Sequence, residues 1–404
     1  MKQTMLVAAI AATAVSISLA QAPVTTVFEG ARVIIGNGGP AIENATIVMR
    51  GDRFMQVGSS ATVKVPAGAA RVSLAGKTVM PAIVDAHVHT STTQPELTDD
   101  LRRRAQFGIG AALSMGLDGS EAPFAQRTQA TPGLARLFIA GRGITAPEKG
   151  RTEVPFWITT PDEGRQAVRE MAAKKVDLIK IWVDDRDGKF PKLTPPLYSA
   201  VIDEAHKHKL RVAAHIFSLE DAKGLLRAGI DAFAHGIRDR DIDEEVVGLF
   251  KARPNVVLIP NMPDRGVAVD YSWLRGKIAD GELQKIQAAA TNRPQAQETF
   301  GIQARNLAKL SAAGVTIAIG TDGNTPWAPH VEMADMVASG MTPAQVLVAA
   351  TRNGAAFVRL ANTGTIEAGK AADFIVLDAN PLDDITNTRK ISAVYLRGAA
   401  VDRK

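Results

Sequence analysis

Apolar and polar residues alternate in short runs at both ends of the chain and follow a different pattern in its middle. The first alternating runs lie between residues 24 and 79, as in Ala31-Arg-Val-Ile-Ile, and turns such as Gly36-Asn-Gly-Gly-Pro separate them. The pattern returns near the other end in Asp373-Phe-Ile-Val-Leu and Ile391-Ser-Ala-Val-Tyr-Leu. Alternation interrupted by glycine-rich turns predicts the strands of a β-meander. We therefore predict a small β-sandwich domain that residues 21–79 and 363–404 build together.

Residues 80–362 combine short apolar runs with helical patterns, which predicts repeated βα units around a parallel sheet. Helix starts follow several runs, as in the capping-box-like Ser218-Leu-Glu-Asp and in Thr342, which precedes a proline. The stretch from Pro260 to Gly314 is longer than one unit needs, and we expect it to add helices over the barrel mouth. The candidate strands are 79–89, 111–116, 134–140, 176–183, 211–216, 230–235, 256–260 and 315–321. Eight strands are what a closed (β/α)8 TIM barrel of the α/β class requires, so we predict that fold.

Composition narrows the chemistry. The 404 residues are 46% hydrophobic and 22% charged, as in ordinary globular proteins, and they include seven histidines and no cysteine. Thiol nucleophiles and cysteine-ligated metal sites are therefore excluded, and any metal must be bound by histidine or oxygen ligands. The formal net charge of +5 is scattered along the chain. Its one tight cluster, Arg102 to Arg104, is expected to be a solvated helix face, so we do not expect a nucleic-acid partner.

The first twenty residues have the layout of a secretory signal peptide. Lys2 precedes an apolar run from Met5 to Leu19, and Ser18-Leu19-Ala20 forms a small-x-small cleavage site. The alternative is an uncleaved N-terminal anchor, although the apolar run is short for a membrane span. We therefore predict a periplasmic or secreted protein that has no stable membrane association after cleavage and that acts on a small-molecule substrate.

Two histidines at alternate positions follow an acidic residue in Asp85-Ala-His-Val-His, at the end of an apolar run. On a strand, His87 and His89 point to the same side and can bind one ion together, although two satisfied polar residues would show the same spacing. Asp85 shares that side and could orient an imidazole. His206 and His208 have the same spacing but lie in a helical pattern, where residues two apart face different directions, so they are predicted to be surface residues.

Four further residues end or interrupt apolar runs in the middle of the chain. His215 and His235 end runs on either side of one helix, which places them at the carboxyl ends of neighbouring strands, the functional face of a barrel. Lys180 lies inside the apolar run 176–183, where a lysine is costly unless it pairs with Asp184 or Asp185 or has captured carbon dioxide. Asp322 follows a run and could bind a metal and accept a proton, or simply cap the next helix.

Candidate substrate contacts are weaker signals. His330 lies in a proline-containing loop after the last predicted strand, and Trp182 follows Lys180 near a strand end. Each has a structural alternative, because a loop histidine and a buried tryptophan are common without any ligand. The arginines near predicted barrel-top loops that could bind a substrate carboxylate are Arg142, Arg151, Arg238 and Arg265.

In this order, the motifs resemble those of the amidohydrolase superfamily, within the metal-dependent branch of imidazolonepropionase-like enzymes and Xaa-Pro or Xaa-Arg dipeptidases. The resemblance includes Asp85-Ala-His-Val-His, Gly320-Thr-Asp and the later string Gly364-Thr-Ile-Glu-Ala-Gly-Lys-Ala-Ala-Asp. It implies two divalent metal ions, zinc being the first choice, and assemblies such as homodimers are common in these families. The ligands that the resemblance implies are His87, His89 and Asp322 for one ion, His215 and His235 for the other, and a carboxylated Lys180 as the bridge between them.

The implied activity is hydrolysis of an amide bond in a dipeptide or N-acyl amino acid by metal-activated hydroxide, with Asp322 as the catalytic proton carrier. Alternatives are a hydrolase of cyclic amides, carbamates or lactones on the same site and a non-catalytic binding protein. The chain departs from the family pattern at Ala82, in Trp182-Val-Asp-Asp-Arg and in Pro260-Asn-Met-Pro. The last two departures fall where substrates bind, so they leave the identity of the substrate undetermined but do not change the expected chemistry.

Overall fold

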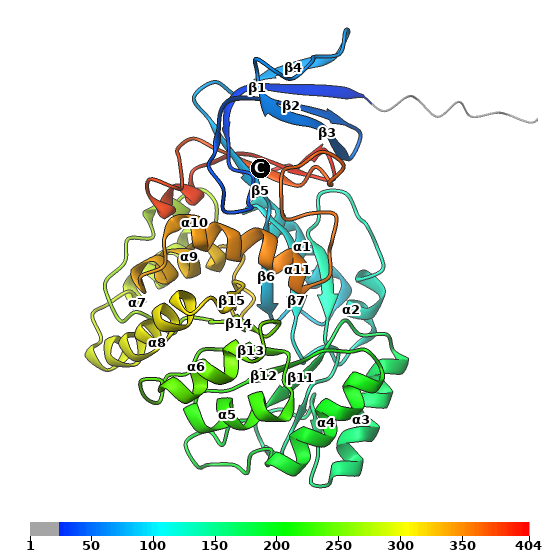
Figure 1. Cartoon of the computed structure of the whole chain (residues 1–404), viewed down its shortest axis with the longest axis vertical. Coiled ribbons are helices and arrows are strands. Elements are labelled where there is room, and N and C mark those ends of the chain that lie inside the picture. The colour runs from blue at the N-terminus through cyan, green and yellow to red at the C-terminus, as the bar shows by residue number, and fades with distance from the viewer. Residues whose placement is uncertain (1–23, 404) are drawn as a thin grey trace, which may run out of the picture.

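The computed structural model describes residues 24–403, so the predicted signal peptide, residues 1–20, lies outside the described residues. Strands from both ends of this range share one sheet, ordered β18-β17-β16-β5-β1-β2-β3, and β4 also pairs with β1. Figure 1 shows this sheet at one end of the molecule, where the last strands lie beside the first ones. Its strands are β1 (Thr25–Val33), β2 (Ile42–Arg50), β3 (Arg53–Ser59), β4 (Ala70–Ser73), β5 (Thr78–Pro81), β16 (Phe374–Leu377), β17 (Ile391–Leu396) and β18 (Ala399–Ala400).

Aromatic packing joins the two ends of the chain inside this sheet. The ring of Phe374 stacks on Tyr395 with centroids 4.6 Å apart and meets Phe28 edge-on at 5.3 Å. Register shifts in β1 on both sides of Ala31 bend the strand, which pairs first with β4 and then with β5. A small β-sandwich domain of both termini was predicted, and in the structure both ends of the described residues contribute strands to one eight-stranded sheet. The domain boundaries at residues 79 and 363 stay a prediction, since only Ala82 separates β5 from the first barrel strand.

Eight parallel strands follow the small sheet, and they match the eight candidate runs. They are β6 (Ile83–Val88), β7 (Ile109–Ser114), β8 (Arg136–Ile139), β11 (Ile179–Trp182), β12 (Val212–His215), β13 (Ala232–Ala234), β14 (Val257–Ile259) and β15 (Thr316–Ile317). The short strands β9 (Ile144–Thr145) and β10 (Phe156–Trp157) extend the edge beside β11. Backbone hydrogen bonds close the ring: Asp177 donates to Ile139 at 2.9 Å, and Ala86 donates to Ile319 at 2.9 Å. The predicted α/β barrel fold is confirmed.

Helices surround these strands (Figure 1). They are α1 (Gln94–Gln106), α2 (Glu121–Gln126), α3 (Pro161–Ala173), α4 (Pro195–Lys207), α5 (Leu219–Ala228), α6 (Glu244–Lys251), α7 (Asp280–Ala289), α8 (Pro294–Ala312), α9 (Ala328–Ala338), α10 (Pro343–Val348) and α11 (Gly354–Phe357). Thr342 forms the expected start of α10 with a reciprocal capping box, and the side chain of Ser218 caps α5. The long segment between β14 and β15 contains a 3-10 turn (Ser272–Leu274) and α7 in addition to α8.

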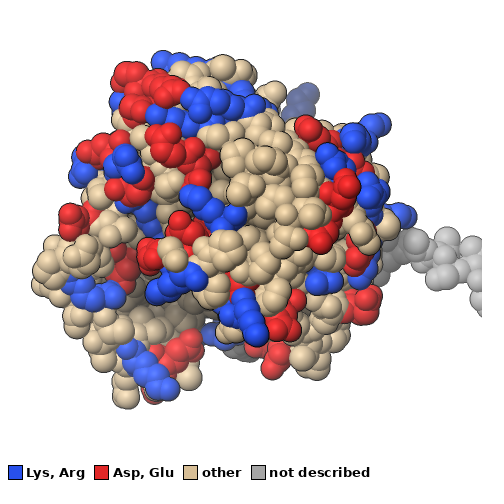
Figure 2. All heavy atoms as spheres, turned by 90° about the horizontal axis from the view of Figure 1, so that it is seen from below, with Lys and Arg blue, Asp and Glu red and all other residues tan. Residues whose placement is uncertain are grey.

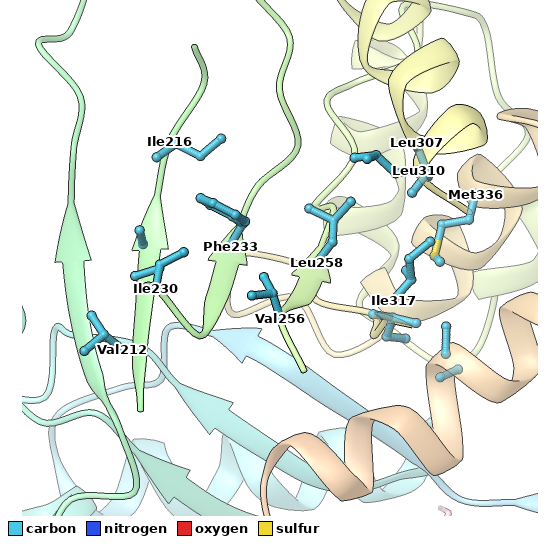
Figure 3. Packing of buried hydrophobic residues seen from close by; sticks show 14 of the residues in the cluster. Val212, Ile216, Ile230, Phe233, Val256, Leu258, Leu307, Leu310, Ile317 and Met336 are labelled. Atoms are coloured by element: carbon cyan, nitrogen blue, oxygen red, sulfur yellow. The ribbon is translucent and has the colours of Figure 1, made fainter. Parts of the chain in front are cut away.

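Side chains of the barrel strands alternate between two apolar clusters. Figure 3 shows Val212 of β12, Phe233 of β13 and Leu258 of β14, in the cluster that also includes Leu307 of α8. The intervening residues, such as Ala213 of β12, belong to a second cluster of mostly small side chains inside the ring. Because side chains two apart share a face, His215 follows Ala213 inward. The alternation thus sets the side of the sheet on which the candidate chemistry lies.

Arg104 corrects one expectation from the sequence. Of the predicted solvated cluster, Arg102 is exposed, but Arg104 is fully buried beneath the end of β6. Its Nη1 lies 3.5 Å from Asp85 Oδ2, and its Nη2 donates to the carbonyl of Gly323 at 3.0 Å. Burial raises the pKa of Asp85 to about 6, and the charge of Arg104 opposes that rise. Arg104 therefore links α1 to the strand ends of β6 and β15.

Arg104→Met is expected to destabilise the protein by about 3–5 kcal/mol at pH 8, because it leaves Asp85 as a buried charge without its cation. The deficit shrinks as the pH falls through the folded-state pKa of Asp85, since a protonated carboxyl needs no counterion. Urea unfolding of metal-free protein at pH 8 and pH 5 measures both values. The exposed Arg102→Met on the same helix is the control and stays within about 0.5 kcal/mol. Equal stability of Arg104→Met and wild type at pH 8 would contradict this role.

Two observations bear on surfaces. No helix within residues 24–403 is both long and apolar enough to cross a membrane. Figure 2 shows acidic and basic side chains interspersed over one face, without a large area of a single sign. No basic stripe of the kind typical of nucleic-acid-binding proteins crosses that face, and the absence of a nucleic-acid partner stays a prediction.

Candidate metal centre

Histidines and one aspartate converge at the carboxyl ends of the barrel strands. His87 of β6, His235 after β13 and Asp322 after β15 each place one ligand atom within 4.8 Å of the others. Asp322 Oδ1 lies 3.1 Å from His87 Nε2 and 2.9 Å from His89 Nε2, and its Oδ2 lies 3.3 Å from His235 Nε2. One carboxylate thus faces three imidazoles.

The backbone turns two of these side chains inward. His235 has φ of 120° and Asp322 has φ of 51°, both in the left-handed region that residues other than glycine seldom adopt. His215 pairs with Ala234 in the sheet, so His235 lies one residue beyond the position equivalent to His215. Simple alternation would place it on the same side as Phe233, facing the helices. Its positive φ instead brings the ring against His87 and His215, with centroids 5.5 Å and 4.4 Å away.

Charge in this group is unevenly distributed. Burial alone would raise the pKa of Asp322, but the neighbouring imidazoles, His87 first, hold it well below its usual range. Burial, followed by the charge of Lys180, lowers the pKa of His87 to about 4. Burial also lowers the pKa of His235 well below its usual value. His87 and His235 are therefore neutral beside an ionised carboxylate, which are the protonation states that metal ligands need.

Lys180 of β11 is completely buried at the bottom of this group. Its Nζ lies 3.4 Å from His87 Nε2 and 3.9 Å from Met115 Sδ. Within residues 24–403 it forms no ion pair, so the alternative of a pair with Asp184 or Asp185 is wrong. Burial lowers its pKa to about 7, which leaves a substantial fraction of neutral amine at neutral pH.

His215 lies at the edge of the cluster. Its ring packs on His235, but its Nε2 lies 3.0 Å from Asp184 Oδ2 and 3.1 Å from Arg186 Nη1. Sequence reasoning treated Asp184 only as a partner for Lys180 and did not consider Arg186. The signal that could have identified both is the run of charged residues that follows β11.

Asn261, after β14, is a second residue that sequence reasoning missed. Its side-chain oxygen accepts a hydrogen bond from His87 Nδ1 at 2.8 Å and from the backbone N–H of Asp322 at 3.1 Å, and its nitrogen donates to Ile259 at 3.0 Å. Because Nδ1 carries the proton of this hydrogen bond, Nε2 of the neutral ring is unprotonated, and it lies on the side of Asp322. Metal-binding histidines are commonly oriented in this way through their second ring nitrogen. The departure Pro260-Asn-Met-Pro was its only sequence signal.

Asn261→Ala is expected to weaken metal affinity roughly 10–100-fold, because His87 loses the acceptor that fixes its ring. Asn261→Asp keeps an accepting oxygen and should retain affinity near that of wild type. Titration of metal-free protein with Zn²⁺ against a competing chelator measures both variants. Wild-type affinity in Asn261→Ala would show that the ring is held by other contacts.

Asp85 does not orient an imidazole, contrary to the sequence expectation. Its Oδ2 accepts a hydrogen bond from Thr321 Oγ1 at 2.8 Å and faces Arg104, while its Oδ1 lies 3.4 Å from the backbone nitrogen of His87. It therefore holds the backbone of the residues on either side of the cluster. Its partners come from α1 and from the segment that follows β15.

Of the two predicted substrate contacts, one lines a cavity and the other does not. Trp182 lines a cavity of about 420 Å³ together with His89, His215 and Asp322. Gly116 and Gly143 make room for its ring, since a Cβ at either position would collide with it. The prediction that this ring contacts substrate stays a prediction.

The prediction that His330 contacts the substrate is wrong. It is only 1% exposed, and its ring nitrogens are bonded to Thr388 Oγ1 at 3.1 Å and to the carbonyl of Phe107 at 2.9 Å. Both nitrogens are used in fastening α9 to neighbouring elements, so the ring is a structural one. The predicted surface positions of His206 and His208, in contrast, are confirmed.

The residues fit a metal ion. Both ring nitrogens of His235 and Nδ1 of His89 are buried and find no hydrogen-bond partner among the described residues. Buried polar atoms without partners are rare in folded proteins and commonly indicate a missing ion or water. Imidazole and carboxylate together are typical ligands of Zn²⁺, Mn²⁺ and Fe²⁺.

Comparisons with known proteins place the chain among hydrolases. A sequence profile of the Amidohydrolase family matches residues 78–401. Imidazolonepropionase from Streptomyces griseus is 26% identical over 366 residues, which cover 85% of this chain and 89% of that protein. A solved structure from Bifidobacterium longum matches 94% of this chain and 95% of its own, at 27% identity and a TM-score of 0.78. A Xaa-Pro dipeptidase with bound methionine in its active site covers 93% and 99%, at 22% identity and a TM-score of 0.75.

Proposed function

We propose that this chain, which belongs to the amidohydrolase family and is a hydrolase of carbon–nitrogen bonds, cleaves the amide bond of a dipeptide or an N-acyl amino acid. The proposed reaction is metal-dependent. The convergence of His87, His235 and Asp322 within 4.8 Å is the observation that carries the proposal. The signal-peptide pattern of residues 1–20 supports the further proposal that the enzyme acts in the periplasm or outside the cell.

The proposed ligands are the six residues that the sequence resemblance implied. His87, His89 and Asp322 would hold one divalent ion, His215 and His235 a second, and a carboxylated Lys180 would bridge them; zinc is our first choice of metal. When bound, such ions polarise a carbonyl and lower the pKa of water. The proximity of His89, His235 and His87 to the carboxylate supports the first group most directly.

Lys180 supports the bridging part of the proposal. The ammonium group would first lose one proton, and the neutral amine would then form a nitrogen–carbon bond with carbon dioxide and release a second proton, so that a buried cation becomes a carboxylate. In the structure this lysine is fully buried beside His87 and has no anionic partner among the described residues. A bound cation would compensate the new negative charge, whereas an ammonium group would repel the ion.

Asp322 is the proposed proton carrier. Its carboxylate is ionised, since the surrounding imidazoles hold its pKa low. It is also one third exposed on the side of the 420 Å³ cavity, where a substrate can reach it. Asp322 would accept a proton from the attacking water and donate it to the amine nitrogen that leaves.

A substrate panel tests the proposal. Protein with measured zinc content is assayed with dipeptides, N-acyl amino acids, a cyclic amide, a carbamate and a lactone. Highest kcat/KM on the first two classes is the expected result. Preference for the cyclic amide, the carbamate or the lactone would overturn the substrate class, and no hydrolysis by fully loaded protein would overturn the activity.

A further inference from the structure

The loop after β11 brings Arg186 back to the candidate metal centre. Arg186 and Asp187 have φ of 55° and 61°, two consecutive left-handed residues of which neither is glycine. Such backbone strain persists where the surrounding structure enforces it and is often found at functional sites. The turn places Arg186 Nη1 3.1 Å from His215 Nε2.

Two carboxylates hold the guanidinium in one position. Its Nε donates to Glu148 Oε1 at 3.1 Å, and its Nη1 donates to Asp184 Oδ2. Glu148 is only 1% exposed and also accepts from Arg151 at 2.7 Å. Arg186 is therefore oriented before any ligand arrives, which reduces the entropy that binding would cost.

One part of the guanidinium remains unused. Arg186 Nη2 is buried, and no residue between 24 and 403 accepts a hydrogen bond from it. A buried charged donor without an acceptor is costly, and the acceptors that match a guanidinium best are carboxylates. Glu148 shares its charge with Arg151, and Arg238 adds a further cation, stacked 3.3 Å over Phe217 on the same wall.

Arg186 lies between two cavities. The cavity of about 420 Å³ contains Asp322 and His215, and the neighbouring cavity of about 390 Å³ is lined by Asp184, Arg186 and Arg238. The contacts of Arg186 and Asp184 with His215 form the boundary between them. A ligand with its amide at Asp322 would therefore extend toward the second cavity past this guanidinium.

We propose that Arg186 binds the α-carboxylate of the substrate and so makes the enzyme selective for amides of amino acids over neutral amides. The inference rests on the proposed amide hydrolysis and deepens it. Of the four arginines considered from the sequence, Arg142 donates to the carbonyl of Val154 and stacks on Phe156, and Arg265 pairs with Asp335. Arg151 pairs with Glu148, and Arg238 stacks on Phe217. Arg186 is a specificity-determining residue, and Glu148 and Asp184 position it.

Two substrates that differ only in the carboxylate test this role. N-acetyl-L-leucine carries it, and N-isopentylacetamide has the same amide and side chain without it. Wild type should prefer the acid, and Arg186→Met should lower kcat/KM for the acid roughly 10–100-fold, mainly through KM, while the neutral amide changes by less than about twofold. The kcat/KM of Arg186→Lys for the acid should lie between the values of wild type and Arg186→Met, because a lysine keeps the charge but lacks the planar guanidinium group. The exposed Arg240→Met is the matched control.

Metal content is measured for every variant, because Arg186 contacts His215. Equal losses on both substrates, or no preference in wild type, would overturn the proposal. If wild type hydrolyses neither substrate, the proposed activity fails, and calorimetric binding of N-acetyl-L-leucine then decides the role of Arg186 by itself. Binding that is lost in Arg186→Met supports the role, whereas equal or absent binding overturns it.

Discussion

Asp322→Asn is expected to lower kcat roughly 10²–10⁴-fold while leaving most of the bound metal in place. An asparagine keeps an oxygen that can face His87 and His89, and it tolerates the left-handed backbone at this position. It cannot accept and return a proton as the carboxylate does. The loss should therefore appear in turnover rather than in metal binding.

Steady-state kinetics together with metal analysis of the same preparation measure this effect. Asp241→Asn, an exposed aspartate paired with Arg305, is the control and should retain wild-type turnover. Near-normal turnover of Asp322→Asn would show that another group carries the proton. Loss of metal in parallel with turnover would assign Asp322 a ligand role alone.

Lys180→Ala is expected to lower both metal content and turnover. Turnover should fall at least roughly 100-fold, because loss of a ligand should reduce activity more than loss of a residue that only supports a ligand, which typically lowers metal affinity or activity 10–100-fold. Formate or acetate should restore part of the activity, since a small carboxylate can enter the space that the side chain leaves. Native mass spectrometry in bicarbonate should find one carbon dioxide on wild type and none on the variant.

Lys223 offers a matched control, because it is also a buried lysine. Hydrogen bonds to Asp243 and Glu245 raise its pKa, so it stays an ammonium ion that cannot take up carbon dioxide. Lys223→Ala should keep the mass increment and the metal. Full metal occupancy and turnover in Lys180→Ala would contradict the proposed bridge.

The sequence predicted the barrel and the positions of most candidate ligands because both depend on local patterns. Alternation with a period of two places His87 and His89 on one side of β6, and a lysine inside an apolar strand predicts a buried amine at Lys180. The order of apolar runs and helices predicted which strands are neighbours. These properties require no knowledge of which distant residues meet.

The sequence pattern did not reveal the partners of those residues. Arg104 belongs to a polar helix pattern, yet it is fully buried because the closing barrel brings α1 over Asp85. Asn261 meets His87 across a separation of 174 residues, and Arg186 reaches His215 only through two left-handed residues.

For His235 and His330 as well, the local sequence pattern and the tertiary structure point to different side-chain directions. Periodicity alone directs His235 toward the helices, and its positive φ reverses that direction. His330 follows a barrel strand, as a ligand would, but the packing of α9 buries its ring against Phe107. Sequence determined which side chains stand at the strand ends, because a strand's faces follow from local periodicity. Only the tertiary structure decided which of them meet, because backbone turns and long-range packing set their final directions.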